Sequence, residues 1–347
     1  MSWQEILGHE SVLERFRRGV SRGRLASSFL FVGPAGVGKF RFARQLAAAL
    51  LCDTNQEQVL EPCGHCPVCQ QVRSESHPDL EVVRKPLDKN FIPLETFIGD
   101  KEHRMREGLC YRISLMPFCG GRKIVIINDA DYLNMESANC LLKTLEEPPP
   151  RSVLILIGTS EHKQLPTIRS RCQVIRFSPL PVAVVERLLV ERKLIEDKDQ
   201  ARELAHLSEG SLERALEYAD LDLRDFRSQL FSFLAQPHAD SVGFSRSLTA
   251  FIDDAGKDAP PKRRRMRQVI LSGAEFYRAL MRGMSSAATA DQQGVLRETV
   301  QQALEKWPGD ERQAAQKLDR CLLAIDQLQA NANVSTLLEC WVDDLAR

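Results

Sequence analysis

Short apolar runs, each followed by a polar or glycine-containing turn, recur through the first half of the chain. They lie at 28–33, 80–84, 123–128, 153–158 and 173–178. Runs that are apolar throughout are typical of strands buried on both faces of a parallel sheet. Between them lie segments rich in helix formers, such as 39–52 and 135–147, and the second stops at a run of prolines. The pattern predicts a parallel α/β domain over residues 1–178.

The strand pattern ends after residue 178, and helical spacing replaces it. Three short helical patterns fill 179–221, which we expect to form a small helical domain. Longer helical patterns follow over 222–347, and their apolar residues repeat at i, i+3 and i+4. These residues include Met266, Val269, Ile270, Phe276, Tyr277 and Leu280, and then Leu318, Cys321, Leu322 and Ile325. Such stripes indicate core or subunit-packing faces rather than cofactor sites.

The composition describes a globular protein with no overall charge preference. Its 347 residues exceed one ordinary core, and 47 Lys and Arg residues balance 47 Asp and Glu residues. No global basic field therefore attracts nucleic acid, and any DNA contact must come from a local patch or a partner. The basic stretch 262–267 is interpreted as a solvated helix start, with phosphate binding as the alternative. No signal-peptide core opens the chain, and no apolar run reaches the roughly 18 residues of a membrane span, so we expect a cytoplasmic protein.

A glycine-rich segment between the first predicted strand and the first predicted helix can bind phosphate. It reads FVGPAGVGKF (31–40), with Gly33, Gly38 and Lys39 at the spacing of a phosphate-binding loop and Gly36 between them. Glycines let backbone N–H groups turn toward phosphate oxygens. The helix N-terminus adds partial positive charge and the lysine adds a full one. These four residues are the candidate nucleotide-binding set.

Two substitutions argue against a metal-assisted reaction at this loop. Phe40 stands where a Ser or Thr hydroxyl would bind Mg²⁺, and a phenyl ring cannot coordinate a hard cation. The strand at 123–128 ends in Asn128 and Asp129, so an amide takes the metal-binding position and an aspartate the water-activating one. We therefore interpret Asp129 and Asp131 as loop acids or part of a helix start, and we predict no hydrolysis by this loop.

Four cysteines with short spacings predict a structural metal site in a module over 52–69. Cys63, Cys66 and Cys69 form a CxxCxxC run, and Cys52 lies eleven residues upstream of the first. Four thiolates suit a closed tetrahedral Zn²⁺ site with no open position. In a reducing compartment, clustered thiols indicate metal binding rather than disulfides. Four unlinked thiols are the alternative interpretation.

Two histidines lie near this module, and six further cysteines are spread along the chain. His65 or His77 could replace one ligand, although four cysteines suffice without them. The remaining cysteines are scattered, and we interpret them as small buried hydrophobic residues. They are Cys110, Cys119, Cys140, Cys172, Cys321 and Cys340.

Several segments together resemble one family, the bacterial clamp-loader subunits of the AAA+ superfamily. Besides the four-cysteine module, the matching segments are NCLLKTLEEPPP (139–150), LPTIRSRCQVIRF (165–177), HPDL (77–80) and GGRKIVII (120–127). The resemblance covers residues 1 to about 220. Over the helical C-terminal part it is weaker and rests chiefly on NANVSTLLE (331–339).

The resemblance implies an α/β AAA+ domain of P-loop type with a zinc module, then a helical lid, then an all-α collar that holds subunits in one ring. Motor members of the family keep the Mg²⁺-binding hydroxyl, an Asp-Glu pair and a Gly-Ser-x-Arg sequence in the lid. This chain reads Gly-Ser-Leu-Glu at 210–213, with Arg214 one place late. It therefore resembles a member that does not hydrolyse ATP. The intact loop glycines leave ATP or ADP bound without turnover as an alternative.

The same resemblance gives a role to an arginine. Family members carry a Ser-Arg-Cys sequence whose arginine reaches into the neighbouring subunit's ATP site, and here it is Ser170, Arg171 and Cys172. A guanidinium there offsets charge on the transferred phosphoryl group, an effect worth about 10³–10⁵ in rate for arginine fingers. The implied role of Arg171 is catalysis in trans. The alternative is a surface arginine beside Arg169.

The function that the resemblance implies is that of a clamp-loader component that helps to place the sliding clamp on primed DNA. The implied partners are motor subunits of the gamma/tau kind, a delta-like subunit, the sliding clamp and primed DNA, with no membrane. One alternative is an active clamp-loader ATPase of the gamma/tau type, against which Phe40 and Asn128 argue. Another is a zinc-dependent nucleic-acid-binding module, against which the neutral charge and the closed thiolate site argue.

Overall fold

The computed structural model describes residues 3–86, 89, 91–104, 106–236, 240–285, 295–306, 309–330 and 332–346. Asn331, the first residue of the predicted segment 331–339, lies outside these residues. The chain forms two compact units: unit 1 comprises 1–198 with 208–213, and unit 2 comprises 199–207 with 214–347. The finer division into three domains, with boundaries at 178 and 221, stays a prediction.

Unit 1 contains a parallel five-stranded sheet in the order β2-β3-β4-β1-β5. The strands are β1 (Ser28–Val32), β2 (Leu80–Val83), β3 (Lys123–Ile127), β4 (Ser152–Gly158) and β5 (Gln173–Arg176). They coincide with the five apolar runs, and every residue of β1 and β4 is buried. In the register, Phe29 lies opposite Ile155 on one side and Gln173 on the other.

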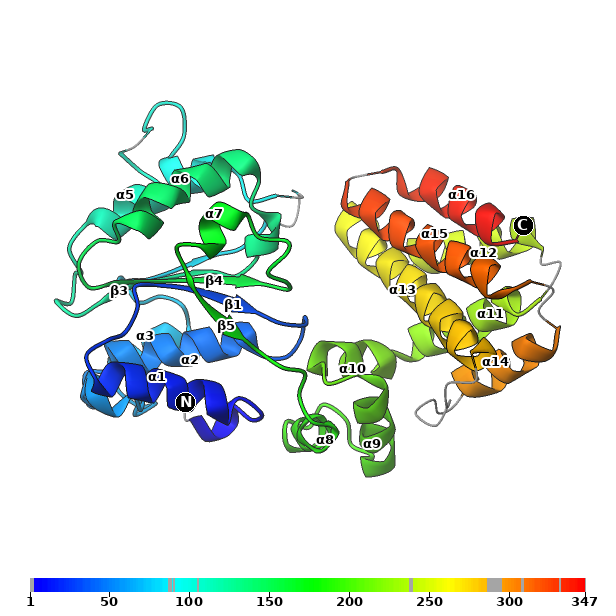
Figure 1. The fold of residues 1–347 in the computed structure, drawn as a ribbon, viewed down its shortest axis with the longest axis horizontal. Coiled ribbons are helices and arrows are strands. Elements are labelled where there is room, and N and C mark those ends of the chain that lie inside the picture. Colours follow the sequence, from blue (N-terminus) through cyan, green and yellow to red (C-terminus); the bar gives the residue numbers. More distant parts are fainter. Residues whose placement is uncertain are drawn as a thin grey trace. The chain divides into compact units, whose positions relative to one another are not determined.

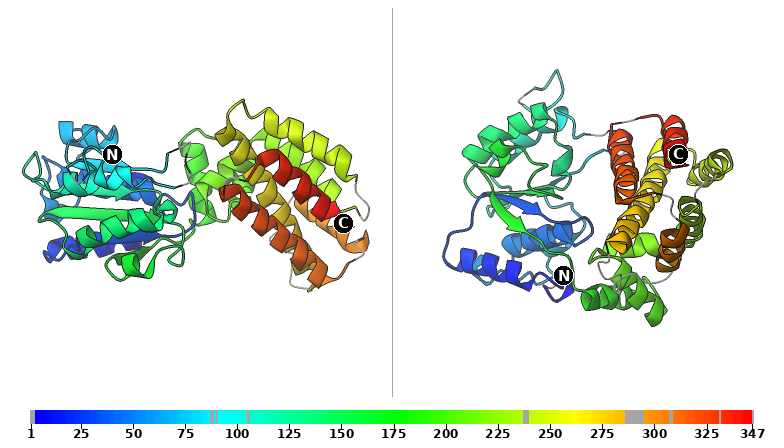
Figure 2. Two further views of the ribbon diagram at one scale, coloured as in Figure 1. Left: turned by 90° about the horizontal axis from the view of Figure 1, so that it is seen from above. Right: turned by 45° about the vertical axis from the view of Figure 1, so that its right-hand side comes forward.

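Helices cover both faces of this sheet (Figure 1). On one face lie α1 (Glu10–Ser21), α2 (Lys39–Leu51) and α3 (Pro67–Arg73), and on the other α5 (Leu109–Ser114), α6 (Met135–Glu146) and α7 (Pro166–Arg169). Shorter elements are η1 (Trp3–Glu5), η2 (Glu57–Val59), α4 (Glu95–Ile98) and η3 (Ala130–Tyr132). The right-hand view of Figure 2 shows the same two helical layers from another direction. The layers confirm the predicted parallel α/β class.

Helix α2 is fixed to the sheet by its apolar face. Phe42 and Leu46, one turn apart, are fully buried. The Phe42 ring contacts Phe16 of α1, Phe31 of β1 and Phe177 just after β5, with ring centroids 5.3 to 6.0 Å apart. Aromatic pairs at such distances stabilise packing beyond the area that they bury. The start of α2 therefore has a fixed position relative to the ends of β1 and β5.

Short helices follow the sheet, in agreement with the sequence pattern. They are α8 (Val182–Glu191), α9 (Lys198–Leu207) and α10 (Leu212–Ala219). Longer helices complete unit 2: α11 (Leu221–Leu234), α12 (Ser241–Asp253), α13 (Ala259–Met284), α14 (Val295–Lys306), α15 (Glu311–Gln329) and α16 (Val334–Ala346). The predicted stripe on α13 is buried and packs with Trp341 of α16. The stripe on α15 is only partly so, because Leu322 is 45% exposed.

The basic stretch 262–267 lies in the first turns of α13, and its expected solvated character is wrong for three of its side chains. Lys262 Nζ lies 2.6 Å from Asp253 Oδ1. Arg263 donates to the carbonyl oxygens of Leu328 and Ala332, and Arg265 donates to that of Phe251. Lys262 therefore pairs with a carboxylate, whereas Arg263 and Arg265 bind backbone carbonyl groups, two of which lie in the last turns of α15 and α12, where carbonyl groups carry partial negative charge.

The scattered cysteines differ in their exposure. Cys172 and Cys321 are buried as expected, but Cys119 and Cys340 are exposed, so the interpretation of all scattered cysteines as buried is wrong. Among the described residues, no helix is both long enough and apolar enough to cross a membrane.

Candidate functional site

The glycine-rich loop lies at the carboxyl end of β1 and leads directly into α2. All five strands are parallel, so the loop after β1 lies at the carboxyl ends of the strands, next to the ends of β4 and β5. Ligands of parallel α/β sheets bind at these ends. Gly38, with φ +96°, is the residue before α2 and Lys39 is the first of the helix. The fold therefore brings the predicted nucleotide-binding residues together on one strand-to-helix turn.

Two glycines of the loop are held against other parts of unit 1. Gly36 has φ +73°, and a Cβ there would lie 2.6 Å from the Cβ of Glu213. Gly33 has φ +150°, and a Cβ there would overlap the carbonyl oxygen of Phe177, just after β5. Side chains are excluded at both positions because the backbone of the loop is in close contact with its neighbours.

Lys39 turns back onto its own loop. Its Nζ donates to the carbonyl oxygens of Gly33 and Pro34, each at 2.6 Å. Burial lowers the pKa of Lys39 to about 8, although the charges of Asp131 and Glu213 oppose this change. In this arrangement the ammonium group is hydrogen-bonded to loop carbonyl groups, and a phosphate would have to replace them as its partner.

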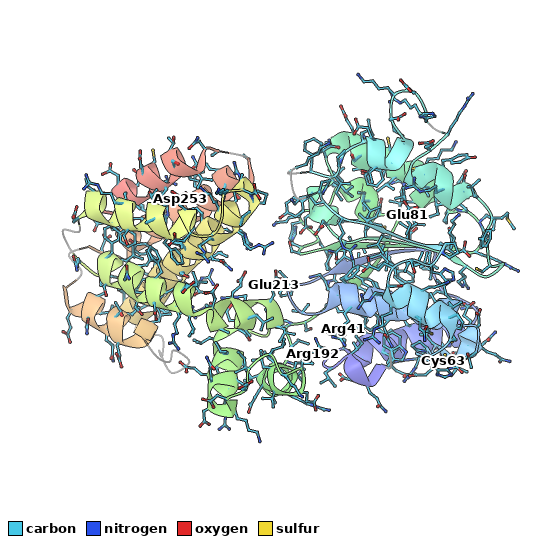
Figure 3. All side chains as sticks on the ribbon, turned by 180° about the vertical axis from the view of Figure 1, so that it is seen from behind. Arg41, Cys63, Glu81, Arg192, Glu213 and Asp253 are labelled. Carbon is cyan, nitrogen blue, oxygen red and sulfur yellow. The ribbon has the colours of Figure 1, made fainter. Side chains whose placement is uncertain are left out.

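The lid sequence at 210–213 closes over the loop from the other side. The backbone N–H of Leu212 donates to the carbonyl oxygen of Gly36 at 3.1 Å. Glu213 lies near the end of α2 that carries Arg41 (Figure 3). Its carboxylate acts on Lys39, and it would repel a phosphate at the position where motor members have an arginine. Arg214 pairs instead with Glu275.

Phe40 is covered by two arginines rather than facing a cation site. Its ring centroid lies 4.8 Å from the Arg84 guanidinium carbon and 5.8 Å from that of Arg44. A guanidinium over an aromatic face is favourable. The position that would carry the Mg²⁺-binding hydroxyl is therefore an aromatic surface with arginines packed on it.

The acids after β3 accept hydrogen bonds from neighbouring segments of the chain. Asp129 Oδ2 accepts a hydrogen bond from the Lys85 backbone N–H at 3.0 Å. Asp131 accepts hydrogen bonds from the backbone N–H of Thr159 at 2.8 Å and from Gln164 Nε2 at 2.6 Å. Asp131 thus ties the loop after β3 to the end of β4. These contacts agree with the interpretation of both aspartates as loop acids.

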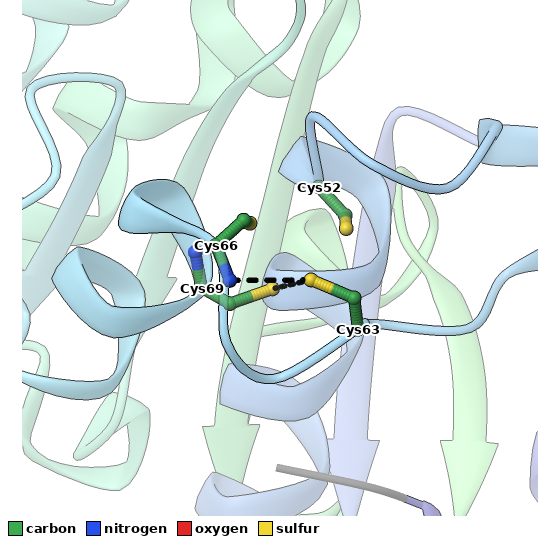
Figure 4. Close-up of side chains that lie close together, drawn as sticks. All are labelled: Cys52, Cys63, Cys66 and Cys69. Atoms are coloured by element: carbon green, nitrogen blue, oxygen red, sulfur yellow. Dashed lines mark hydrogen bonds between the residues drawn. The ribbon is translucent and has the colours of Figure 1, made fainter.

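The four predicted cysteine ligands converge at the other end of α2 (Figure 4). The sulfur atoms of Cys52, Cys63, Cys66 and Cys69 all lie within 4.8 Å of one another. Cys52 directly follows α2, whereas Cys66 is the residue before α3 and Cys69 lies inside that short helix. The four-cysteine cluster can hold a metal ion. Neither predicted alternative histidine, His65 or His77, belongs to the cluster.

Backbone N–H groups prepare the cluster for thiolate ligands. The N–H of Cys66 donates to the sulfur of Cys63, and the N–H of Cys69 to that of Cys66, both at 3.3 Å. A hydrogen bond with Thr54 is the largest cause of the lowered pKa of Cys63, which is about 5. Thiolates are the metal-binding form of cysteine, so the donor set fits a tetrahedral metal with sulfur ligands.

The predicted trans-acting arginine is held by a neighbouring acid. Ser170 and Arg171 follow α7, and Arg171 Nε lies 2.7 Å from Oε1 of Glu146, the last residue of α6. Its Nη1 donates to the carbonyl oxygen of Thr167 at 3.0 Å. The Arg171 side chain is 30% exposed and Glu146 is 48% exposed. The sequence analysis did not predict Glu146 as a partner, although it lies in the Leu-Glu-Glu-Pro segment.

A parallel sheet with a phosphate-type loop after β1, acidic residues after β3 and an arginine after α7 defines the AAA+ class of P-loop type. The family described as DNA polymerase III, delta subunit, has a model that matches residues 8–181. That match is half of the chain. The chain belongs to this family.

Curated relatives include two kinds of DNA polymerase III subunit. A subunit delta′ from Pseudomonas aeruginosa is 34% identical over 210 residues, which cover 60% of this chain and 60% of the relative. A subunit tau from Escherichia coli is 33% identical over 224 residues, which cover 63% of this chain and 32% of the relative. The chain therefore matches less than two thirds of the length of either relative.

One solved structure to which the chain was matched is a DNA polymerase III gamma-subunit-related protein from Thermotoga maritima. It has a TM-score of 0.40 and 16% sequence identity, and the alignment covers 96% of this chain and 98% of that one. A likeness of this degree does not bear on function.

Proposed function

We propose that the chain is a delta-prime-like subunit of the clamp loader of DNA polymerase III and helps to load the sliding clamp onto primed DNA. One observation supports this function most strongly: the loop that would bind nucleotide is closed on itself, while an arginine from a family motif lies at the surface of the same unit. Such a subunit contributes to a neighbour's reaction and has none of its own. Delta-prime relatives are consistent with this assignment.

The absence of intrinsic hydrolysis follows from three residues. Phe40 and Asn128 remove both protein ligands to Mg²⁺, and Glu213 replaces a cation of the lid by an anion. Lys39, which would bind the β- and γ-phosphates, donates to loop carbonyl groups instead. We therefore assign the loop a structural role, in which Gly33, Gly36 and Gly38 allow close packing. ATP or ADP bound without turnover remains the alternative for this loop.

Arg171 is the residue that acts on the neighbour's ATP. Its guanidinium is partly exposed, and its present anionic partner, Glu146, is itself at the surface. A planar guanidinium matches the oxygen atoms of a phosphate by two parallel hydrogen bonds, which a lysine cannot provide. Exchange of a carboxylate for the phosphates of a neighbouring motor subunit would complete that subunit's site in trans.

The remaining parts of the assignment concern metal, partners and location. Zn²⁺ is the metal that fits four converging thiolates, and its role is structural because no coordination position is left open. Partners are motor subunits of the gamma/tau kind and a delta-like subunit, with the sliding clamp and primed DNA in the assembled complex. Residues 222–347 serve as the collar. The subunit works in the cytoplasm as part of the DNA polymerase III holoenzyme.

A second function is favoured by the tau relative: an active clamp-loader ATPase of the gamma/tau type. The closed loop and Glu213 argue against it. Steady-state ATP hydrolysis by the purified full chain separates the two assignments. Robust Mg²⁺-dependent turnover by the unmodified chain would replace the first assignment by the second.

The decisive experiment assembles the complex from motor subunits, a delta-like subunit and this chain, as wild type or as Arg171→Ala. ATPase activity and clamp loading are measured after assembly has been verified. We expect total ATPase to fall only partly, because other motor sites use other arginines, and clamp loading to fall further. Arg171→Lys should restore little activity. Arg169→Ala, which removes the adjacent positive charge, is the matched control and should behave as wild type.

Equal ATPase and loading with wild-type and Arg171→Ala chains would exclude a trans-acting role. Stability is not expected to obscure the result, because an exposed ion pair such as Arg171–Glu146 contributes about 0–1 kcal/mol.

A further inference from the structure

Arginines gather beside the phosphate-type loop, on the side of α2 that faces α3 and the end of β2. We name Arg44 of α2, Arg73 at the end of α3 and Arg84 after β2 the arginine cluster. The nearest acid is Glu75, whose Oε1 lies 2.7 Å from Arg84 Nη2 and 3.6 Å from Arg44 Nη1. One carboxylate thus serves two guanidinium groups.

The positive charge of the arginine cluster exceeds the negative charge around it. The pKa of Arg44 is lowered, first by burial and then by the charges of Arg41, Arg73 and Arg84, while Glu75 acts in the opposite direction. Asp129 is a second acid that acts on Arg84, but its carboxylate already accepts a backbone hydrogen bond. Because the whole chain has a formal net charge of zero, this excess is local.

The guanidinium groups are held in a fixed arrangement. Those of Arg84 and Arg44 lie over the ring of Phe40, and Arg44 Nη1 also donates to the carbonyl oxygen of Arg73 at 3.5 Å. Contact with an aromatic ring uses the face of a guanidinium and leaves its N–H edges for other acceptors. The Arg84 side chain is 44% exposed, and that of Arg44 is 26% exposed. Arg73 makes no ion pair with any residue that the structure describes.

We propose that the arginine cluster binds the phosphate groups of a nucleic-acid strand. Guanidinium edges match phosphate oxygens by paired hydrogen bonds, and several arginines from separate elements can contact successive phosphates of one strand. A strand needs only a charged surface, whereas a free nucleotide would also need space for its base.

This site deepens the proposed function, since it gives the chain a DNA contact of its own. It rests on the proposed function only for the identity of the strand as primed DNA. The arginine finger and the cluster are separate, because Arg171 follows α7 on the opposite face of the sheet from α2 and α3.

The test measures binding of the full chain to a labelled single-stranded oligonucleotide of about 16 nucleotides by fluorescence anisotropy, over a series of salt concentrations. Variants are Arg73→Gln, Arg84→Gln and the double variant. Arg73→Gln breaks no described side-chain contact and is the variant least able to disturb folding. Arg151→Gln is the matched control, because Arg151 precedes β4 and so lies at the amino ends of the strands, whereas Arg84 follows the carboxyl end of β2.

We expect the double variant to bind at least about 10-fold more weakly at low salt. The slope of log K against log salt should become shallower by about 0.7 for each contact removed. Arg73→Gln alone should show the smaller change, and Arg151→Gln should match the wild type. Thermal unfolding of each variant verifies that the fold is retained.

Equal affinity and equal slope for wild-type and double-variant chains would overturn the proposal. So would competition by poly-glutamate as effective as that by unlabelled DNA, which would indicate an acidic protein partner. Competition by inorganic triphosphate at the same phosphate concentration would indicate a free phosphate ligand and would also overturn it. Failure of any of these tests leaves the Arg171 experiment unaffected, because that experiment reads ATPase at a neighbour's site.

Discussion

Helix α2 ends in two different environments. At its start, the Nζ of Lys39 donates hydrogen bonds to two carbonyl oxygens of the preceding loop. At its other end, Cys52 joins three more thiols whose sulfur atoms converge. A helix favours anions at its N-terminus and cations at its C-terminus. The comparison teaches that the dipole alone does not determine which end takes an external ion. An end whose polar groups are already paired resists a ligand, and an end with converging donors invites one.

The largest expected effect is at the cysteine end. We expect about one zinc ion per chain in protein purified without chelator, measured by elemental analysis. Removal of the metal should lower the free energy of unfolding by several kcal/mol, because binding energy of a structural metal is folding energy. Cys66→Ser should have the same effect. Cys340→Ser, which changes an exposed thiol on α16, is the control and should leave stability and metal content unchanged. Protein without zinc would contradict the assignment.

The next effect concerns packing at the start of α2. Gly36→Ala should destabilise the chain by about 2–3 kcal/mol, because Gly36 has φ +73° and a Cβ there would overlap the lid segment. Gly23→Ala is the matched control. Gly23 has φ +62° but nothing within 4 Å of a Cβ, so only the backbone strain remains, about 1 kcal/mol. Chemical denaturation of both variants provides the comparison. Equal losses would mean that the lid does not close on the loop.

A smaller effect depends on pH. Lys39 has a pKa of about 8 in the folded chain against 10.5 as its ordinary value, so the unfolded chain binds more protons between these pH values. Stability therefore rises with pH in this window. The difference in free energy of unfolding between wild type and Lys39→Met should change in favour of the wild type by about 1–2 kcal/mol from pH 8 to pH 10. A difference that stays constant would mean that Lys39 is not buried in the loop.

The smallest effect is expected from restoring metal ligands. Phe40→Thr with Asn128→Asp should add little binding of Mg²⁺-ADP, measured by calorimetry, because Lys39 stays bonded to its loop and Glu213 stays beside it. Adding Glu213→Arg should increase binding, since it replaces a repulsive charge by an attractive one. Tight nucleotide binding by the unmodified chain would show that the loop opens readily.

Most of the fold could be predicted from sequence because its strands are continuous apolar runs with helices between them. β1 and β4 are buried at every residue, so their sequences are apolar almost throughout and clearly indicate strands buried on both faces. The cysteine cluster could be predicted equally well, because three of its four ligands lie within a stretch of seven residues. Short spacing fixes proximity before any tertiary contact is known. The solvated character expected for 262–267 was wrong, because the carbonyl groups that bind Arg263 come from a helix end far along the chain.

The electrostatic partners of the candidate site could not be predicted for the same reason. Glu146 and Arg171 are 25 residues apart, and only packing of α7 against α6 brings them together. The arginine cluster combines residues from α2, α3 and the end of β2. The hydrogen bonds of Lys39 to its own loop depend on the conformation of its side chain, which the packing around it determines. Sequence patterns specify which elements form, whereas these contacts depend on how the elements are packed.

If Arg171 acts as proposed, it must exchange its ion pair with Glu146 for one with a phosphate. Reaching a neighbour's phosphates would then replace one negative partner by another, and the number of ion pairs would be unchanged. The gain is then the difference between a phosphate and a carboxylate, which grows with the charge of the nucleotide. A triphosphate would then compete with Glu146 better than a diphosphate would. Arg171 would therefore contact the neighbouring subunit when that subunit holds ATP, and would pair with Glu146 again after hydrolysis. The strength of the contact between subunits would then depend on the nucleotide that the neighbour holds.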